Sequence, residues 1–106
     1  MKIKRHLIQK AVSRVLSATK PVRIILFGSA ASGKTTPDSD IDLLVLEKNI
    51  INPREESLRL RKTLNGLGVP VDVFVMSFAR YEETKNVIGG IAYTANKYGK
   101  PVYETA

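Results

Sequence analysis

The segment from Ile24 to Val45 constrains the fold more than any other part of this 106-residue chain. It begins with an apolar run that closes on Gly28, and it ends with a second apolar run that starts at Ile41. Between the two runs, Pro37 and its polar neighbours are poor residues for a helix interior. The segment therefore predicts two short strands joined by a loop, and not a strand that leads into a helix.

Apolar spacing predicts the other elements of secondary structure. A repeat of three to four residues indicates helices, and short apolar or alternating runs indicate strands. The predicted elements are a helix over residues 3–16, strands over residues 22–27, 41–46 and 69–76, a helix from Asn52-Pro53 with apolar positions Leu58, Leu60 and Leu64, short helices over residues 79–85 and from Gly89-Gly90 toward Tyr98, and an edge strand over residues 101–103. This order predicts an α/β (α+β) fold, with a small mixed sheet of three to four strands flanked by helices, in a single domain spanning residues 1–106.

The composition argues against several classes of protein. The sequence contains no cysteine, so disulfides and thiolate metal sites are excluded. No apolar run approaches the roughly 20 residues that a membrane span requires. The basic N-terminus is not followed by the apolar region and cleavage site of a secretory signal. We therefore expect a cytoplasmic protein with no membrane association.

The net charge of +7 comes from the first part of the chain. In the rest of the chain the basic and acidic residues cancel. Residues 1–23 contain no acidic residue and seven basic ones: Lys2, Lys4, Arg5, Lys10, Arg14, Lys20 and Arg23. One interpretation is a salt-sensitive contact with nucleic acid or an acidic protein surface. The other is a solvated helix face, which the lack of an aromatic or glycine-rich recognition motif favours. His6, the single histidine, is expected to be a solvated surface residue.

The loop after the first strand fits a phosphate-binding pattern. The eight residues from Gly28 to Thr35, GSAASGKT, match the P-loop pattern GxxxxGK[ST]. A P-loop holds phosphates because it runs straight into a helix, whose N-terminal amides contact the phosphate oxygens. Here Pro37 follows two residues after Thr35, and the chain is short for a P-loop domain with its parallel sheet and crossover helices. These features disfavour the P-loop, although Lys34 keeps a possible phosphate contact.

Three aspartates offer a different chemistry. Asp40 and Asp42 lie two residues apart at the start of a strand, so their side chains share a face about 7 Å apart. Asp72 is the single charged residue of the strand over residues 69–76, and it shares a face with apolar side chains, so a nearby cation is expected. If the two strands pair, the three carboxylates converge into a set that suits Mg²⁺ or Mn²⁺. The alternative is structural, with Asp40 in a turn and Asp72 paired to an arginine.

With these residues the sequence resembles the DNA polymerase beta-like nucleotidyltransferase superfamily, and within it the small, stand-alone minimal nucleotidyltransferases (MNT proteins). The resemblance extends over nearly the whole chain and rests on the strand 24–27, Gly28-Ser29, the run Asp40-Ile41-Asp42 and the third carboxylate Asp72. Members commonly read GSxARG after the strand, and Ser32 stands here at the arginine position. Lys34 is the nearest cation that can replace that arginine.

The resemblance implies a role for each of these residues. Asp40 and Asp42 would hold Mg²⁺ (or Mn²⁺) against the phosphates of a nucleoside triphosphate, and Asp72 would complete the metal site and help deprotonate the attacking hydroxyl. Gly28 and Ser29 would hold the phosphate tail. The implied reaction transfers a nucleoside monophosphate, AMP from ATP, to a hydroxyl group and releases diphosphate.

The resemblance also implies a protein partner. MntA-type antitoxins act on HEPN-type toxins, either by attaching AMP to them or by binding them. Because we expect a single domain, we also expect the acceptor to be supplied by a partner. Two alternatives remain open. The chain is a catalytically weak module that neutralises its partner by forming a complex, or it binds nucleic acid through its basic first helix.

Overall fold

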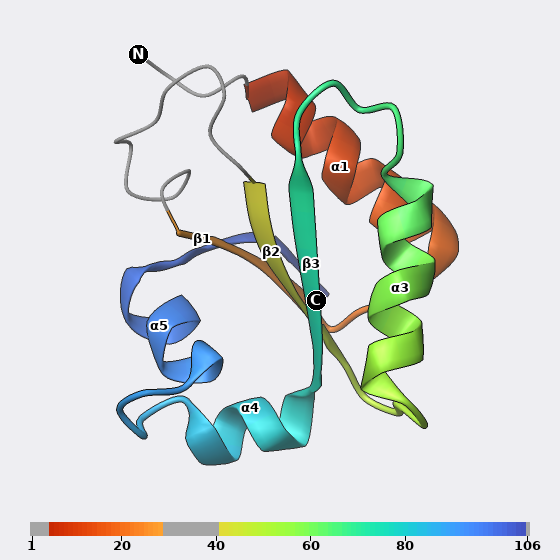
Figure 1. Ribbon diagram of the computed structural model, residues 1–106. Helices are drawn as coiled ribbons and strands as arrows, with labels where there is room; N and C mark the ends of the chain where they lie inside the picture. Colours follow the sequence, from red (N-terminus) through yellow and green to blue (C-terminus); the bar gives the residue numbers. More distant parts are fainter. Residues whose placement is uncertain (1–4, 29–40, 106) are drawn as a thin grey trace.

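The computed structural model describes residues 5–28 and 41–105, and Figure 1 shows how their helices and strands are arranged. The elements in chain order are α1 (Arg5–Ala18), β1 (Arg23–Phe27), β2 (Ile41–Glu47), α3 (Pro53–Thr63), β3 (Val71–Ser77), α4 (Phe78–Thr84), α5 (Ile91–Tyr98) and β4 (Lys100–Glu104). Each element predicted from the sequence is present, with ends that differ by a few residues. None of the helices formed by residues 5–28 and 41–105 has the length and apolarity that crossing a membrane requires.

The strands of the described residues form one mixed sheet in the order β3-β2-β1-β4. β1 pairs antiparallel with both β2 and β4, whereas β2 pairs parallel with β3. The parallel pair is possible because α3 carries the chain from the far end of β2 back to the start of β3. The predicted mixed α/β fold is therefore confirmed.

Helices cover both faces of the sheet (Figure 1). On one face, side chains from α1 and α3 pack against alternate residues of β2, among them Ile41, Leu43 and Val45, which are fully buried. On the other face, α4 and α5 pack against Leu44 and Leu46, which are also fully buried. The expectation that Ile41 and Leu43 face a core is confirmed. Because the residues that point to either face of the sheet are buried, β2 is a central strand with no solvent-facing side along most of its length.

Local sequence explains where α3 begins and which of its residues are buried. The Asn52 side chain accepts hydrogen bonds from the backbone N–H groups of Arg54 and Glu55, at 3.1 and 3.2 Å, so it caps the helix, which begins where the sequence predicts. Leu60 is fully buried, whereas Leu58, another of the predicted apolar positions of this helix, is 51% exposed. Two residues correspond to about 200° around a helix, so Leu58 and Leu60 lie on nearly opposite sides.

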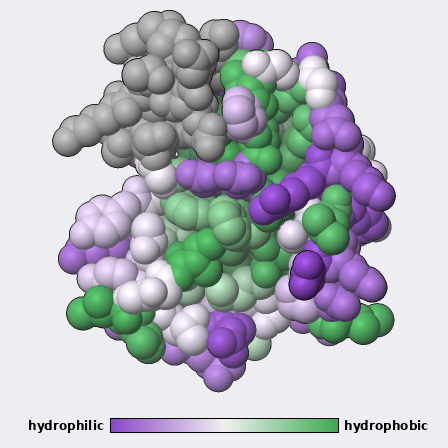
Figure 2. Space-filling view, viewed as in Figure 1, coloured by the Kyte–Doolittle hydropathy of each residue, from purple (hydrophilic) through white to green (hydrophobic). Residues whose placement is uncertain are grey.

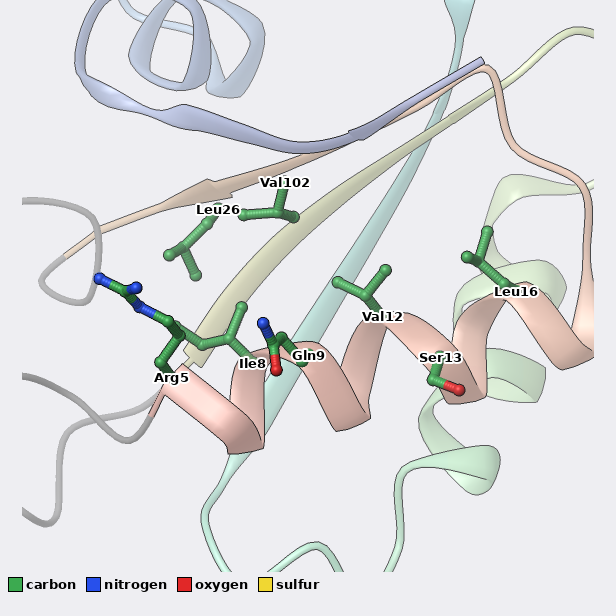
Figure 3. A pocket seen from close by; sticks show the side chains of 8 residues that line it. All are labelled: Arg5, Ile8, Gln9, Val12, Ser13, Leu16, Leu26 and Val102. Atoms are coloured by element: carbon green, nitrogen blue, oxygen red, sulfur yellow. The ribbon is translucent and has the colours of Figure 1, made fainter. Parts of the chain in front are cut away.

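The first helix has a wider apolar face than the sheet covers. Ala11 and Val15 are fully buried, whereas Leu16 on the same helix is 36% exposed. A groove of about 520 Å³ remains between α1 and the β1–β4 side of the sheet. Figure 3 shows Val12 of the helix facing this groove, with Leu26 and Val102 on the opposite wall.

An acidic side chain is buried at the far end of β2. Glu47 is 8% exposed, and its Oε1 accepts a hydrogen bond from the Thr19 hydroxyl at 2.9 Å. Within the described residues, its Oε2 is buried without a hydrogen-bond partner. Burial, followed by the neighbouring Glu56 carboxylate, raises the pKa of Glu47 to about 7. Glu56 itself is held by Arg59, which lowers the pKa of that second carboxyl group. Glu47 is therefore largely protonated below neutral pH.

We predict that Glu47 makes the protein less stable as the pH rises from about 4.5 to about 7. Over this range the folded protein retains a proton that the unfolded chain, with the ordinary glutamate pKa of 4.5, has released. The free energy of unfolding should then fall by up to about 3 kcal/mol. Urea unfolding at several pH values measures the change. Glu47→Gln should remove this fall in the free energy of unfolding. Glu55→Gln, an exposed change on the same side of the molecule, should leave the pH dependence unchanged. An unchanged slope in Glu47→Gln would contradict the assignment.

Candidate active site

Two of the three predicted carboxylates lie side by side in the sheet. In the register of the parallel pair, Asp42 of β2 stands opposite Asp72 of β3. Side chains of paired residues project from the same face of a sheet, and adjacent strands are about 4.8 Å apart. The two aspartate-bearing strands are therefore neighbours, which is the condition under which the sequence predicts that the carboxylates converge. On its other side Asp42 is paired with Phe27, the last residue of β1, so both carboxylates lie near the point where β1 ends.

The side chains that lie next to these carboxylates on the same face of the sheet are apolar. The ring centroids of Phe27 and Phe74 lie 5.7 Å apart. Phe27 is paired with Asp42 in the register, and Phe74 follows Asp72 by two residues on the same face of β3. Leu44, the next residue of β2 on this face, is fully buried. The carboxylates thus stand at the edge of an apolar layer, with Asp42 partly buried and Asp72 open to solvent.

Asp72 is more exposed than the sequence indicated. Its side chain is 45% exposed, because β3 is an edge strand and Asp72 is near its beginning. The cation expected near it is present, since Arg61 Nη1 of α3 lies 4.0 Å from Asp72 Oδ1. This is a long and half-exposed ion pair, which contributes little to stability. Arg61 could not be identified from the sequence, because nothing in the spacing of α3 reveals which arginine turns toward β3.

Gly28 places the end of β1 directly against Asp42. Its φ of 77° is in the left-handed region that glycine adopts without strain. A Cβ atom at this position would overlap the Asp42 carboxylate oxygen Oδ2 and would lie 3.3 Å from Asp42 Cγ. The space that a side chain would fill at Gly28 is therefore taken by the carboxylate of Asp42.

Other predicted site residues lie outside the described residues. They are Asp40, Ser29 and Lys34, together with Ser32 at the family's usual arginine position. Asp40 directly precedes Ile41, the first residue of β2. Within residues 5–28 and 41–105 no group of three acidic or histidine side chains is arranged to hold a metal ion. The convergence of three carboxylates therefore remains a prediction, and two of the three are in register.

The pairing of β1 with β2 bears on the P-loop interpretation. A P-loop lies between a strand and a crossover helix, which returns the chain to a parallel strand. Here the strand after the GSAASGKT segment is β2, and it is an antiparallel neighbour of β1. An antiparallel neighbour needs no crossover, so the topology favours the carboxylate interpretation.

Part of the basic N-terminal segment has structural contacts. Arg14 Nη1 donates to the carbonyl of Asn65 at 2.8 Å and so ties α1 to the chain after α3. The Arg23 guanidinium lies 5.4 Å from the centre of the Phe78 ring and 3.8 Å from the carboxylate of Glu104. His6 is exposed, as expected. Two of the seven basic residues are thus used within the fold, which weakens the case for a continuous nucleic-acid surface.

We predict that Gly28→Ala destabilises the protein and displaces the Asp42 carboxylate. The matched control is Gly66→Ala, because Gly66 has a similar φ of 80° and an added Cβ there meets no atom within 4 Å. In both variants the left-handed backbone lowers the free energy of unfolding by about 1–2 kcal/mol. The decrease is larger in Gly28→Ala because the added Cβ atom clashes with Asp42. Urea unfolding measures both losses. In an Asp42→Ala background the extra loss should disappear, and equal losses in the two single variants would contradict the packing.

Comparison with known proteins identifies the family of this chain. The model of the nucleotidyltransferase domain family matches residues 8–92. A search of curated proteins gave no significant match. Similar folds include a crystal structure of a proposed nucleotidyltransferase from Sulfolobus solfataricus, with a TM-score of 0.65 and 21% identity over 93% of this chain and 78% of that one. A crystal structure of a toxin–antitoxin with AMP-PNP has a TM-score of 0.57 and 22% identity over 92% of this chain and 73% of that one. The match covers most of the chain, which therefore belongs to the nucleotidyltransferase domain family.

Proposed function

We propose that the protein is a Mg²⁺-dependent nucleotidyltransferase that transfers AMP from ATP to a hydroxyl group of a partner protein. The observation that carries the proposal is the in-register pair of Asp42 and Asp72, with Gly28 packed against the first of them. The pair lies within the segment that matches the nucleotidyltransferase family. Magnesium is commonly bound by one or two carboxylates together with substrate phosphates, and the described pair fits that requirement.

In the proposed reaction the hydroxyl oxygen attacks the alpha-phosphorus of ATP. A new P–O bond forms to the acceptor, the bond from the alpha-phosphorus to the bridging oxygen breaks, and diphosphate leaves. Asp72 is the proposed base, because its half-exposed carboxylate is open to an acceptor, and it takes the hydroxyl proton. Bound Mg²⁺ would neutralise the charge that develops on the phosphates.

The other residues act on the nucleotide. Asp42, with Asp40, is proposed to hold the metal ion. Gly28 lets the backbone approach the phosphates closely, and Ser29 donates to them. Lys34 is the proposed additional cation at the phosphate tail. These assignments combine the family resemblance with the position of Gly28 and Asp42 at the end of β1 and the start of β2.

We further propose that residues 1–106 form one domain whose acceptor is a HEPN-type toxin, with the chain acting as its antitoxin. The similarity of the fold to a structure of a toxin–antitoxin with AMP-PNP supports a role of this kind. The alternative that the chain neutralises its partner by binding alone is separated from this proposal by the transfer experiment below.

We predict that label from alpha-labelled ATP is transferred to the product of the neighbouring reading frame when Mg²⁺ is present. Asp42→Asn should reduce transfer at least about 100-fold, because the side chain keeps its shape but loses the charge that holds the metal. Glu83→Gln, an exposed change on α4, is the matched control and should leave transfer unchanged. A tight complex without label in the wild type would show that binding alone is the function.

We also predict that Lys34→Ala weakens Mg–ATP binding less than about tenfold, whereas Asp42→Asn abolishes it. The reason is that Lys34 is proposed to add one charge contact to the phosphates, while the carboxylates are proposed to hold the metal ion. Isothermal titration calorimetry with Mg–ATP measures both effects. The opposite result, with binding lost in Lys34→Ala and retained in the aspartate variant, would establish the P-loop interpretation.

A further inference from the structure

The strand that carries Asp72 has an open edge. β3 is the last strand of the sheet, and within the described residues no strand pairs with its outer side. The Ile41 N–H donates to the Pro70 carbonyl at 3.0 Å, which shows the side on which β3 bonds β2. Because backbone groups alternate in direction along a strand, the N–H and C=O groups of Val71, Val73 and Val75 point away from β2. They form a ladder that another extended chain can pair with.

One of these outward groups is covered by a displaceable side chain. Arg61 Nη2 of α3 donates to the Val73 carbonyl at 3.3 Å, and its Nη1 lies 4.0 Å from Asp72. Both contacts are long, and the arginine side chain is 42% exposed. An incoming backbone N–H can replace Arg61 at the Val73 carbonyl with little loss of hydrogen bonding.

A hollow of about 240 Å³ runs beside this edge. Its lining includes Phe74, Met76 and Ile91 on the apolar side and, on α3, two arginines with a serine between them, Arg54, Ser57 and Arg61. In Figure 2 apolar surface is visible between α3 and α5, with hydrophilic side chains along α3. The arginines are seven residues apart, so they lie on one side of the helix two turns apart. Two cations in line beside a strand edge favour an extended segment that carries acidic side chains.

We infer that the acceptor is an extended, acidic, hydroxyl-bearing segment of the partner protein, which adds to the outer edge of β3 as a further strand. This inference rests on the proposed function and names the surface that selects its acceptor. A residue paired with Asp72 on the added strand projects from the same face, at the strand spacing of about 4.8 Å. Its hydroxyl group then lies beside the proposed base, while flanking carboxylates face Arg54 and Arg61. The backbone gives affinity and the arginines give selectivity.

The test is the affinity of the product of the neighbouring reading frame for variants of β3, measured without ATP in an Asp42→Asn background. Val75→Pro removes an outward N–H and leaves the bonds between β3 and β2 intact, so binding should weaken at least tenfold. Val75→Ala is the matched control, because it removes the side chain and keeps the N–H, and its affinity should change less than threefold. Urea unfolding confirms that both variants are folded. Equal affinities of Val75→Pro and Val75→Ala would overturn the inference, as would the absence of any complex.

A second pair of variants tests the charges. Arg54→Glu should weaken the complex about tenfold, whereas Arg80→Glu, an equal change of charge on α4 outside the hollow, should weaken it less than threefold. Equal effects would mean that overall charge and not this edge attracts the partner, which would overturn the inference. Mg–ATP binding, measured separately on the variants with Asp42 intact, should be unchanged in all of them. If the wild-type protein does not bind Mg–ATP, the proposed function fails. The affinities of the β3 and arginine variants for the partner still decide whether the partner binds at this edge.

Discussion

The pairing of β2 with a strand on each side is the constraint on which the rest of the structure depends. β2 is antiparallel to β1 and parallel to β3, and most of its side chains are fully buried on one face or the other. Burial of an aliphatic side chain contributes about 1.5–3 kcal/mol, so the register of this strand is strongly determined. A shift by one residue would exchange its two faces and would move Asp42 away from both Gly28 and Asp72.

The two ends of β2 show how position determines what a carboxylate can do. Asp42 stands near the beginning of the strand, next to the half-exposed Asp72 on the edge strand. Glu47 stands at the other end, 8% exposed, where burial raises its pKa to about 7. A pair of carboxylates open on one side fits a hydrated metal ion and a substrate phosphate, whereas an enclosed carboxyl group is stabilised by a proton. The same kind of residue thus supports the proposed chemistry at one end and packing at the other.

Edge position gives β3 a role beyond that of a structural strand. It is paired on one side alone within the described residues, and it carries the proposed base close to its beginning. Arg61 reaches from α3 to both the Val73 carbonyl and the Asp72 carboxylate. One arginine thus links the open edge, the α3 surface and the candidate site. This arrangement is the physical basis for placing acceptor recognition on the same strand as the reaction.

The sequence by itself determined the kinds and order of the elements, because hydrophobic periodicity, Asn52-Pro53 and Gly28 act locally. It also identified Asp42 and Asp72 by residue type and spacing. It did not place them side by side, since parallel pairing of β2 and β3 requires α3 to pack across the sheet. The packing of α3 and β3 likewise determined which of their side chains are covered. It left Leu58 exposed and Asp72 half-exposed, and it brought Arg61 next to Asp72. Those outcomes were decided by the tertiary structure, because burial and long-range contacts arise when elements far apart in the chain are packed together.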